Sequence, residues 1–322
     1  MSLAPVRHFR SETTLITDPA GLAALKPAWR ALWQRCPAAT PFQSPEWLLP
    51  WWDMFAPGSL RVIAVYEAGE LTGLAPLYAQ DACLRPLGVS LSDYQDVLAL
   101  PGSHALPAIA AAIGTMTDIA ECRFDEVPPD AAVLGLQIPG WDERMETASP
   151  CPQLDLQQRL PRSPLRHVRT ARRHAARRGE CVIIEGDADN ALPLIAELKR
   201  LNVARQSGSV FADDRVEAFH TAAMPGLMQA GLAQLYVLTI ADQMAAVYYG
   251  LRHRHRAYAY LGGFDPAFAF ESPGAILLAH AIESARREGT LVYDFLRGGE
   301  AYKYDWGGRD RFNVRYVLTR ST

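Results

Sequence analysis

Cysteine is scarce in this chain of 322 residues, which contains only five, at positions 36, 83, 122, 151 and 181. They are odd in number, scattered, and never spaced as C-x-x-C. A disulfide framework or a cysteine-rich zinc site is therefore not expected, and a reducing compartment fits this usage.

Long apolar runs are also missing. No stretch approaches the ~20 apolar residues that a membrane-spanning helix needs. The first ten residues, MSLAPVRHFR, contain no apolar run of secretory-signal length. We therefore expect a cytoplasmic protein without an integral membrane segment, whose membrane contacts, if any, are peripheral.

The chain has little excess charge, with a formal net charge of -3, and so shows no global attraction to nucleic acid or anionic lipid. Several catalytic motifs are absent: the P-loop, H-E-x-x-H, G-x-G-x-x-G and a complete G-x-S-x-G elbow. We accordingly expect neither a metal nor a covalent nucleophile. Hydrophobic residues make up 49%, which is enough for a globular core.

The length favours two domains, and a proline-rich segment, residues 149–153, is typical of a linker. We expect an N-terminal domain over 1–152 and a C-terminal domain over 153–322. In the first, the patterns predict a strand at 13–17, a helix beginning at Ser44-Pro45, and a hairpin of strands 61–66 and 71–78.

The second half shows clearer patterns. A helix is predicted from Ser163 to Arg178, ending at Gly179, and further helices over 191–204, 214–229 and from Ser272 to before Gly289. Strands are predicted at 233–240, 245–252, 256–262, 291–295 and 312–318. This order indicates a mixed α/β (α+β) fold with a mostly antiparallel sheet flanked by helices.

The first candidate site is the helix start Ser272-Pro273-Gly274-Ala275. Unpaired N–H groups at a helix N-terminus can bind phosphate, and Gly274 lacks a side chain that would block the approach. Simple helix capping is the alternative.

A second candidate is the loop after Tyr293, which is dense in charged and aromatic residues. Carboxylates beside basic side chains can act as general bases or bind polar substrates. A structural ion-pair network is the alternative. The candidates are Asp294, Arg297, Glu300, Lys303 and Tyr304.

A third candidate is the basic helix, where the arginines at 162, 166, 169, 173 and 177 recur at helical spacing on one face. Arg169 and Arg173 stand at its centre. The face is either simply solvated or binds an anion such as a nucleotide phosphate, a sugar phosphate or an RNA backbone. A fourth candidate is the loop with Asp93, Tyr94 and Asp96, for which turn chemistry is the alternative.

Four stretches together resemble the CelD-like (BioF2-like) acetyltransferase branch of the GNAT superfamily, which is related to the FemAB peptidyltransferases. They are Pro41–Trp47, Ser92–Asp96, Arg166–Gly179 and Gly262–Gly307, the last containing Ser272-Pro-Gly and Asp294-Phe-Leu-Arg-Gly. The resemblance implies two tandem GNAT-like domains. It also implies transfer of an acyl group from acyl-CoA, such as acetyl-CoA, to an amine, in cellulose, exopolysaccharide or cell-envelope synthesis.

The resemblance places the CoA diphosphate at Ser272–Ala275 and the acceptor along 294–303. The usual Q/R-x-x-G-x-G/A phosphate loop is incomplete, since Gly274 stands alone. An aminoacyl-tRNA donor, as in FemAB proteins, and a non-catalytic assembly factor for a polysaccharide synthase are the alternatives. As a mechanism, we expect Asp294 or Glu300 to take the amine proton and backbone N–H groups near Tyr248 and Tyr249 to stabilise the oxyanion.

Overall fold

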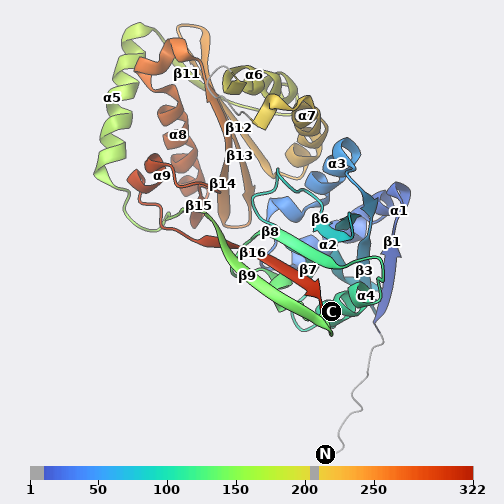
Figure 1. The fold of residues 1–322 in the computed structure, drawn as a ribbon. Helices are drawn as coiled ribbons and strands as arrows, with labels where there is room; N and C mark the ends of the chain where they lie inside the picture. Colours follow the sequence, from blue (N-terminus) through green and yellow to red (C-terminus); the bar gives the residue numbers. More distant parts are fainter. Residues whose placement is uncertain (1–10, 204–209, 322) are drawn as a thin grey trace, which may run out of the picture. The chain divides into compact units, whose positions relative to one another are not determined.

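The computed structural model describes residues 11–203 and 210–321, which divide into two compact units (Figure 1). The first unit contains residues up to Ala148 and from Phe312 onward, and the second contains Ser149–Arg311. Ala204, the expected end of one helix, lies outside the described residues, as do the first ten residues.

The first unit has two sheets, with strand orders β1-β3-β4-β7 and β2-β5-β6-β8-β16-β9. Its strands are β1 (Glu12–Ile16), β2 (Ser59–Leu60), β3 (Val62–Glu67), β4 (Glu70–Ala75), β5 (Leu77–Gln80), β6 (Cys83–Pro86), β7 (Leu98–Ala99), β8 (Glu121–Val127), β9 (Trp141–Pro150) and β16 (Phe312–Arg320). Its helices are α1 (Pro19–Ala24), α2 (Lys26–Arg35), η1 (Pro41–Gln43), α3 (Pro45–Phe55), α4 (Ala105–Gly114) and η2 (Ala132–Gly135).

The hairpin expected in the first half is present, because β3 and β4 pair in antiparallel fashion. Its second strand is shorter than predicted. Pro76 separates β4 from β5, and the two strands join different sheets. A proline has no N–H to donate to a strand ladder, which accounts for the break at this position.

The last strand, β16, pairs with β8 of the first unit, with Val317 opposite Arg123 and Leu318 opposite Cys122. The sequence places this strand at 312–318 and in the C-terminal domain. The structure instead returns it to the first sheet system, where Tyr316 and Leu318 are buried in the core. Alternation of buried and exposed residues marks a strand, but it carries no information about which distant strand will be its partner.

The second unit has a six-stranded sheet in the order β10-β15-β14-β13-β12-β11. Its strands are β10 (Gln153–Asp155), β11 (Cys181–Glu185), β12 (Ala233–Ile240), β13 (Gln243–His253), β14 (Arg256–Phe264) and β15 (Val292–Asp294). Its helices are α5 (Arg162–Arg178), α6 (Ala191–Val203), η3 (Val210–Ala212), α7 (Asp214–Gln229), η4 (Pro266–Glu271), α8 (Pro273–Arg287) and α9 (Ala301–Asp305).

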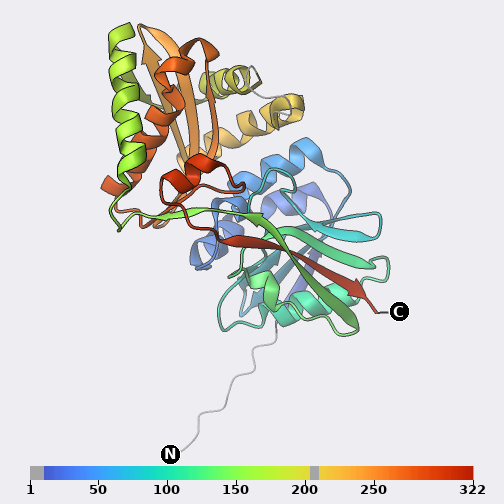
Figure 2. The same ribbon diagram turned by 60° about the vertical axis from the view of Figure 1, so that its left-hand side comes forward.

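Helices cover both faces of this second sheet. α5 and α8 pack on one face, and α6 and α7 pack on the other (Figures 1 and 2). In α5, Val168, Ala171 and Ala175 are buried against the core that also contains Ile276 and Ile282 of α8. These apolar side chains form the face on which this helix packs against the core.

These two units confirm the expected mixed α/β fold with mostly antiparallel sheets flanked by helices. None of the helices in the described ranges combines the length and apolarity needed to cross a bilayer.

Helix α6 lies unusually close to β14 at Gly263. A Cβ added at Gly263 would lie 2.8 Å from the Leu201 side chain and 3.1 Å from the Asn202 backbone nitrogen. At the neighbouring Gly262, an added Cβ would meet only the Val247 carbonyl oxygen, at 3.7 Å. Only Gly263 is therefore required for the packing of α6.

We expect Gly263→Ala to lower the free energy of unfolding by about 1–3 kcal/mol, because α6 must shift to admit the methyl group. Gly262→Ala is the matched control and should keep the wild-type midpoint. Urea unfolding followed by circular dichroism measures both. Equal midpoints for the two variants would show that α6 is free to move away from β14.

Candidate functional site

The candidate site of the second unit begins where two parallel strands separate. β14 and β15 pair over only three positions, from Arg256 opposite Val292 to Tyr258 opposite Asp294. β14 then continues to Phe264, paired with β13 on its other edge, whereas the chain after β15 turns at Leu296, where φ is +59°. Among the described strands, none pairs with the β15-facing edge of β14 beyond Tyr258.

Helix α8 begins directly beyond the end of β14 and η4. Ser272 precedes it in a left-handed conformation, with φ of +48°, and Pro273 is its first residue. The N–H groups of Ala275 and Ile276 both donate to the Ser272 carbonyl, so the N–H of Gly274 precedes the helical ladder. Ser272, Gly274 and Ala275 are half-buried, which leaves this helix end partly accessible. Its N–H groups and dipole favour a negatively charged ligand.

Arg178, the last residue of α5, holds the segment before this helix start. Its guanidinium donates to the Ala267 carbonyl at 2.7 Å and to the Glu271 carboxylate at 3.2 Å. It also lies 3.9 Å from the centre of the Phe268 ring. Because Glu271 is buried beside Ser272, this ion pair neutralises a carboxylate that would otherwise repel an anion at the helix end.

Asp294, a candidate base in the sequence, is 0% exposed. It accepts hydrogen bonds from Gln153 Nε2 at 2.9 Å, from the Leu296 N–H at 2.9 Å and from Arg256 at 3.3 Å. These three donors commit the carboxylate to holding the end of β15. The structural ion-pair alternative therefore describes Asp294 better than a role as general base.

Lys303 has a similar internal role and does not face a substrate. Its side chain is 2% exposed, and its ammonium donates to the carbonyls of Leu296, Arg297 and Gly298 at 2.7–3.2 Å. Glu300 completes its environment with an ion pair of 2.8 Å. The loop after β15 is thus held together by hydrogen bonds from the buried ammonium of Lys303 to its carbonyls.

Glu300 is the accessible carboxylate of this loop, with its side chain 56% exposed. Its carboxylate lies against Gly298, where an added Cβ would meet it at 2.4 Å, and Gly298 has a φ of +110°. Glycine tolerates both the backbone conformation and the close approach. The ion pair with Lys303 orients the Glu300 carboxylate, and Gly298 leaves room for it.

The remaining candidates of this loop differ in exposure. Arg297 is half-buried and Tyr304 is exposed, with its hydroxyl donating to Asp310 at 2.8 Å. This hydrogen bond, together with burial and nearby charge, raises the pKa of Tyr304.

Tyr248 and Tyr249 lie in the middle of β13, which pairs with β12 on one edge and β14 on the other. Both residues are buried, and the Tyr248 hydroxyl is 2.7 Å from the Tyr293 hydroxyl. The backbone around these tyrosines is therefore engaged in the sheet ladder. Among the described strands, the edge that lacks a pairing strand lies one strand further on, in β14 beyond Tyr258.

In the first unit, the predicted loop residues Asp93, Tyr94 and Asp96 are all buried. Asp96 accepts from the N–H groups of Val97, Ala132 and Val133 at 2.8–3.0 Å. Burial raises the pKa of this carboxyl to about 7, and the three N–H groups act in the opposite direction. Asp96 thus anchors the start of η2. This structural role resembles the turn chemistry that is the alternative to a binding site at this loop.

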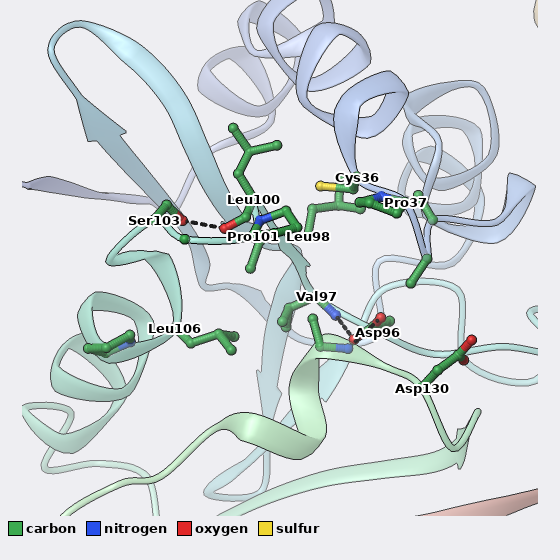
Figure 3. Close-up of a pocket in the computed structure, with 16 residues that line it drawn as sticks. Cys36, Pro37, Asp96, Val97, Leu98, Leu100, Pro101, Ser103, Leu106 and Asp130 are labelled. Atoms are coloured by element: carbon green, nitrogen blue, oxygen red, sulfur yellow. Dashed lines mark hydrogen bonds between the residues drawn. The ribbon is translucent and has the colours of Figure 1, made fainter.

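Asp96 also lines a cavity of about 360 Å³ in the first unit (Figure 3). Its other lining residues include Cys36, Leu98, Leu106 and Asp130. Two acidic side chains, mostly apolar residues and no basic side chain line this cavity, so nothing in it attracts an anionic donor. The anion-favouring features are in the second unit.

The row of arginines on α5 is exposed, as the spacing predicts, and includes Arg169 and Arg173. Arg172 and Arg178 lie outside the row and pair with Glu283 and Glu271. The pairing of Arg178 with Glu271 joins residues 93 positions apart, and no local pattern indicates it. Within the described ranges, no group of three or more His, Cys, Asp or Glu could hold a metal ion.

Comparisons with known proteins bear on the family of the second unit and on the fold of the chain. Residues 162–304 match the family model described as acetyltransferase (GNAT) domain. No curated protein sequence matches the chain significantly.

Solved structures match nearly the whole chain at low identity. The structure of FemX is 15% identical, with a TM-score of 0.62, and the match covers 95% of this chain and 96% of that one. The C-terminal domain of a putative lysylphosphatidylglycerol synthetase from Agrobacterium fabrum is 12% identical, with a TM-score of 0.59 and coverages of 93% and 92%. A tandem GNAT protein from the clavulanic acid pathway is 12% identical, with a TM-score of 0.50 and coverages of 97% and 99%.

These matches confirm the resemblance drawn from the sequence, and the low identities limit what they show to the fold. Residues 162–304 form an acetyltransferase (GNAT) domain, and the chain as a whole shares the fold of FemX and of a tandem GNAT protein.

Proposed function

We propose that this protein is an N-acyltransferase that moves an acyl group from acyl-CoA to an amine acceptor, and that the reaction takes place at the carboxyl ends of β14 and β15. The observation that carries the proposal is the short parallel pairing of these strands, followed at once by the accessible start of α8. In open sheets, ligands bind outside the carboxyl ends of the strands. A donor with a diphosphate and an extended amide chain suits both features.

The diphosphate of the donor would rest at Ser272–Ala275, with Gly274 allowing the closest approach. An added Cβ at Gly274 would lie 3.7 Å from the Phe264 ring, so the protein itself does not require glycine there. The missing side chain at Gly274 therefore serves the approach of a ligand to the backbone N–H groups, and the packing of the fold does not need it. Arg178 supports this site by neutralising Glu271 and by fixing the chain that enters α8.

The pantetheine arm and the thioester would lie along the open edge of β14. Peptide groups on that edge can pair with the amides of the donor in the manner of an added strand. A backbone N–H of the same edge would stabilise the oxyanion that forms when the amine attacks the thioester carbonyl. This assignment replaces Tyr248 and Tyr249, whose strand is already paired on both sides.

Glu300 would take the proton from the attacking amine, directly or through water. The new C–N bond forms, the C–S bond breaks, and the departing thiolate takes up the proton that the amine released. Asp294 holds Leu296 and Arg256 in place and so positions the loop without touching the substrate. Arg297 and Tyr304 border this loop and are the side chains that we assign to the acceptor.

A donor panel is the direct test of the proposed function. Saturating CoA or acetyl-CoA should raise the melting temperature, since a ligand at 100 times its Kd stabilises the folded state by about 2.7 kcal/mol. Acetyl-CoA with a panel of amines and amino sugars should release free thiol. An aminoacyl-tRNA is the second arm of the panel. Stabilisation and transfer with aminoacyl-tRNA alone would replace acyl-CoA as the donor, and no response to either would end the transferase proposal.

The diphosphate site predicts the effect of Gly274→Ala. A methyl group between the donor phosphate and the backbone N–H groups should raise KM for acetyl-CoA about tenfold, which is the loss of one charge-assisted hydrogen bond. The melting temperature should not fall, because alanine favours a helix. Gly114→Ala, in α4 of the first unit, is the matched control and should leave KM unchanged. An unchanged KM in Gly274→Ala would move the diphosphate away from α8.

The general-base assignment predicts the effect of Glu300→Gln. Turnover should fall about 10²–10⁴-fold at neutral pH, because glutamine cannot accept the amine proton. The loss should shrink at high pH, where the acceptor amine deprotonates without help. Asp294→Asn is the comparison variant and should lower the melting temperature through its lost ion pair with Arg256. If Glu300→Gln keeps its turnover within about threefold, the base is water or another group.

A further inference from the structure

The strongest feature outside the proposed active site is the row of arginines along α5, defined as Arg162, Arg166, Arg169, Arg173 and Arg177. All five are exposed, and no ion pair to an acidic side chain is present for any of them within the described ranges. Two exposed arginines elsewhere in the second unit are paired with acids, since Arg200 pairs with Glu197 and Arg215 with Asp213. The row is therefore a surface whose charge the protein itself leaves uncompensated.

The geometry of the row suits an extended anionic partner better than a single small anion. Fifteen residues separate its first and last members, which is about 22 Å along a helix axis. A diphosphate would occupy only a fraction of that length. α5 contains no Asp or Glu, so no like charge interrupts the attraction along the row.

The opposite face of α5 is buried against the core of the second unit. Val168, Ala171 and Ala175 are buried and pack against the core with α8, whereas the five arginines of the row are exposed. Arg286 and Arg287, in the last turn of α8, are exposed as well. Arg172 and Glu283 link the two helices, which places further basic residues on the same layer of the unit.

An exposed aromatic side chain adjoins the end of the row. Phe270 is 74% exposed, and its ring is stacked on His174 of α5 with a centroid distance of 4.4 Å. Burial of an exposed phenyl ring is favourable at an interface that has an apolar interior beneath a charged surface. A row of cations beside such a ring matches the surface of an anionic bilayer.

We propose that the α5 arginine row, with Phe270, docks this protein on an anionic lipid bilayer. The arginines attract the acidic headgroups, and the phenyl ring enters the boundary between headgroups and acyl chains. RNA is the competing polyanion. A convex helix with one aromatic ring offers phosphate contacts, but it lacks the groove and the series of stacking platforms that single-stranded nucleic acid occupies.

Vesicle co-sedimentation of the whole protein tests the proposal. Binding is expected to vesicles of phosphatidylcholine with 30% phosphatidylglycerol, to weaken as salt is raised, and to be absent with phosphatidylcholine alone. Each arginine near an anionic surface contributes about fivefold in affinity, so Arg166→Gln, Arg169→Gln and Arg173→Gln combined should weaken binding about 100-fold. No binding to anionic vesicles by the wild-type protein would overturn the proposal.

The matched control removes the same charge elsewhere. Arg35→Gln, Arg200→Gln and Arg215→Gln combined also lower the net charge by three, at exposed positions that are paired with acids. This variant should bind vesicles within about twofold of wild type. Equal losses in both triple variants would mean that net charge, and not the row, governs binding.

Two further variants test the nature of the surface. Replacing the same three arginines of the row with lysine should retain most of the binding, because a bilayer responds to charge and does not need the guanidinium fork. Phe270→Ala should weaken binding about tenfold, corresponding to the loss of one buried phenyl ring. Loss of vesicle binding in the lysine variant would contradict a bilayer partner.

Fluorescence anisotropy with a tRNA-sized RNA completes the experiment. Row-dependent binding of this RNA, without binding to anionic vesicles, would overturn the bilayer assignment in favour of nucleic acid. A failure of the donor panel would leave the vesicle result untouched, because docking does not depend on turnover.

Discussion

The arrangement of the second unit depends on one constraint, the parallel pairing of β14 and β15. Parallel neighbours cannot be joined by a tight turn, so the chain must cross the sheet between them, and here α8 provides the crossover. The start of that helix is therefore placed at the carboxyl end of β14. The pairing then stops after three residues, so the strand edge and the helix end become accessible at the same place. A longer ladder would have closed the edge of β14 with backbone hydrogen bonds.

Two buried charged side chains hold the loop after β15 in its conformation. Asp294 and Lys303 are both almost completely buried, and each gathers backbone groups from the loop after β15. A buried charge is tolerated only when its partners replace the lost water. The partners of Asp294 are Gln153, Arg256 and the Leu296 N–H, and those of Lys303 are three loop carbonyls and Glu300. In the mechanism that we propose, this rigidity matters because the ion pair with Lys303 orients the Glu300 carboxylate, for which Gly298 leaves room. Positioning of this kind is a large part of what a transferase without a covalent intermediate can contribute.

Much of the fold could be predicted from the sequence, because its evidence is local. The helix start at Ser272-Pro273, the apolar face of α5 and the strands β12 to β14 follow from caps and periodicity over a few residues. Those patterns indicate which face of a helix or strand is buried and where the element ends, but they do not indicate which distant element it packs or pairs with. The return of β16 to the first unit, the division of β4 from β5 between two sheets and the pairing of Arg178 with Glu271 all join residues whose relation is set by the tertiary fold.

The candidate site shows the same limit at the level of single side chains. Composition places Asp294, Glu300 and Lys303 in one loop, and it cannot tell which of them faces inward. Burial separates them: Asp294 and Lys303 serve the loop, and Glu300 alone stays accessible. Tyr248 and Tyr249 are a similar case, because a sequence shows a strand but not whether both of its edges are already paired.

The distribution of charge has a further consequence for how the protein meets a polyanion. The formal net charge is -3, although the row on α5 alone carries five uncompensated arginines. The remainder of the chain is therefore more acidic than the total suggests, and the cavity of the first unit has two acidic and no basic side chains in its lining. Any extended anionic surface is attracted by one helix and repelled by the average of the rest. Such a division gives the attraction a direction, because it favours an approach of the anionic surface toward α5.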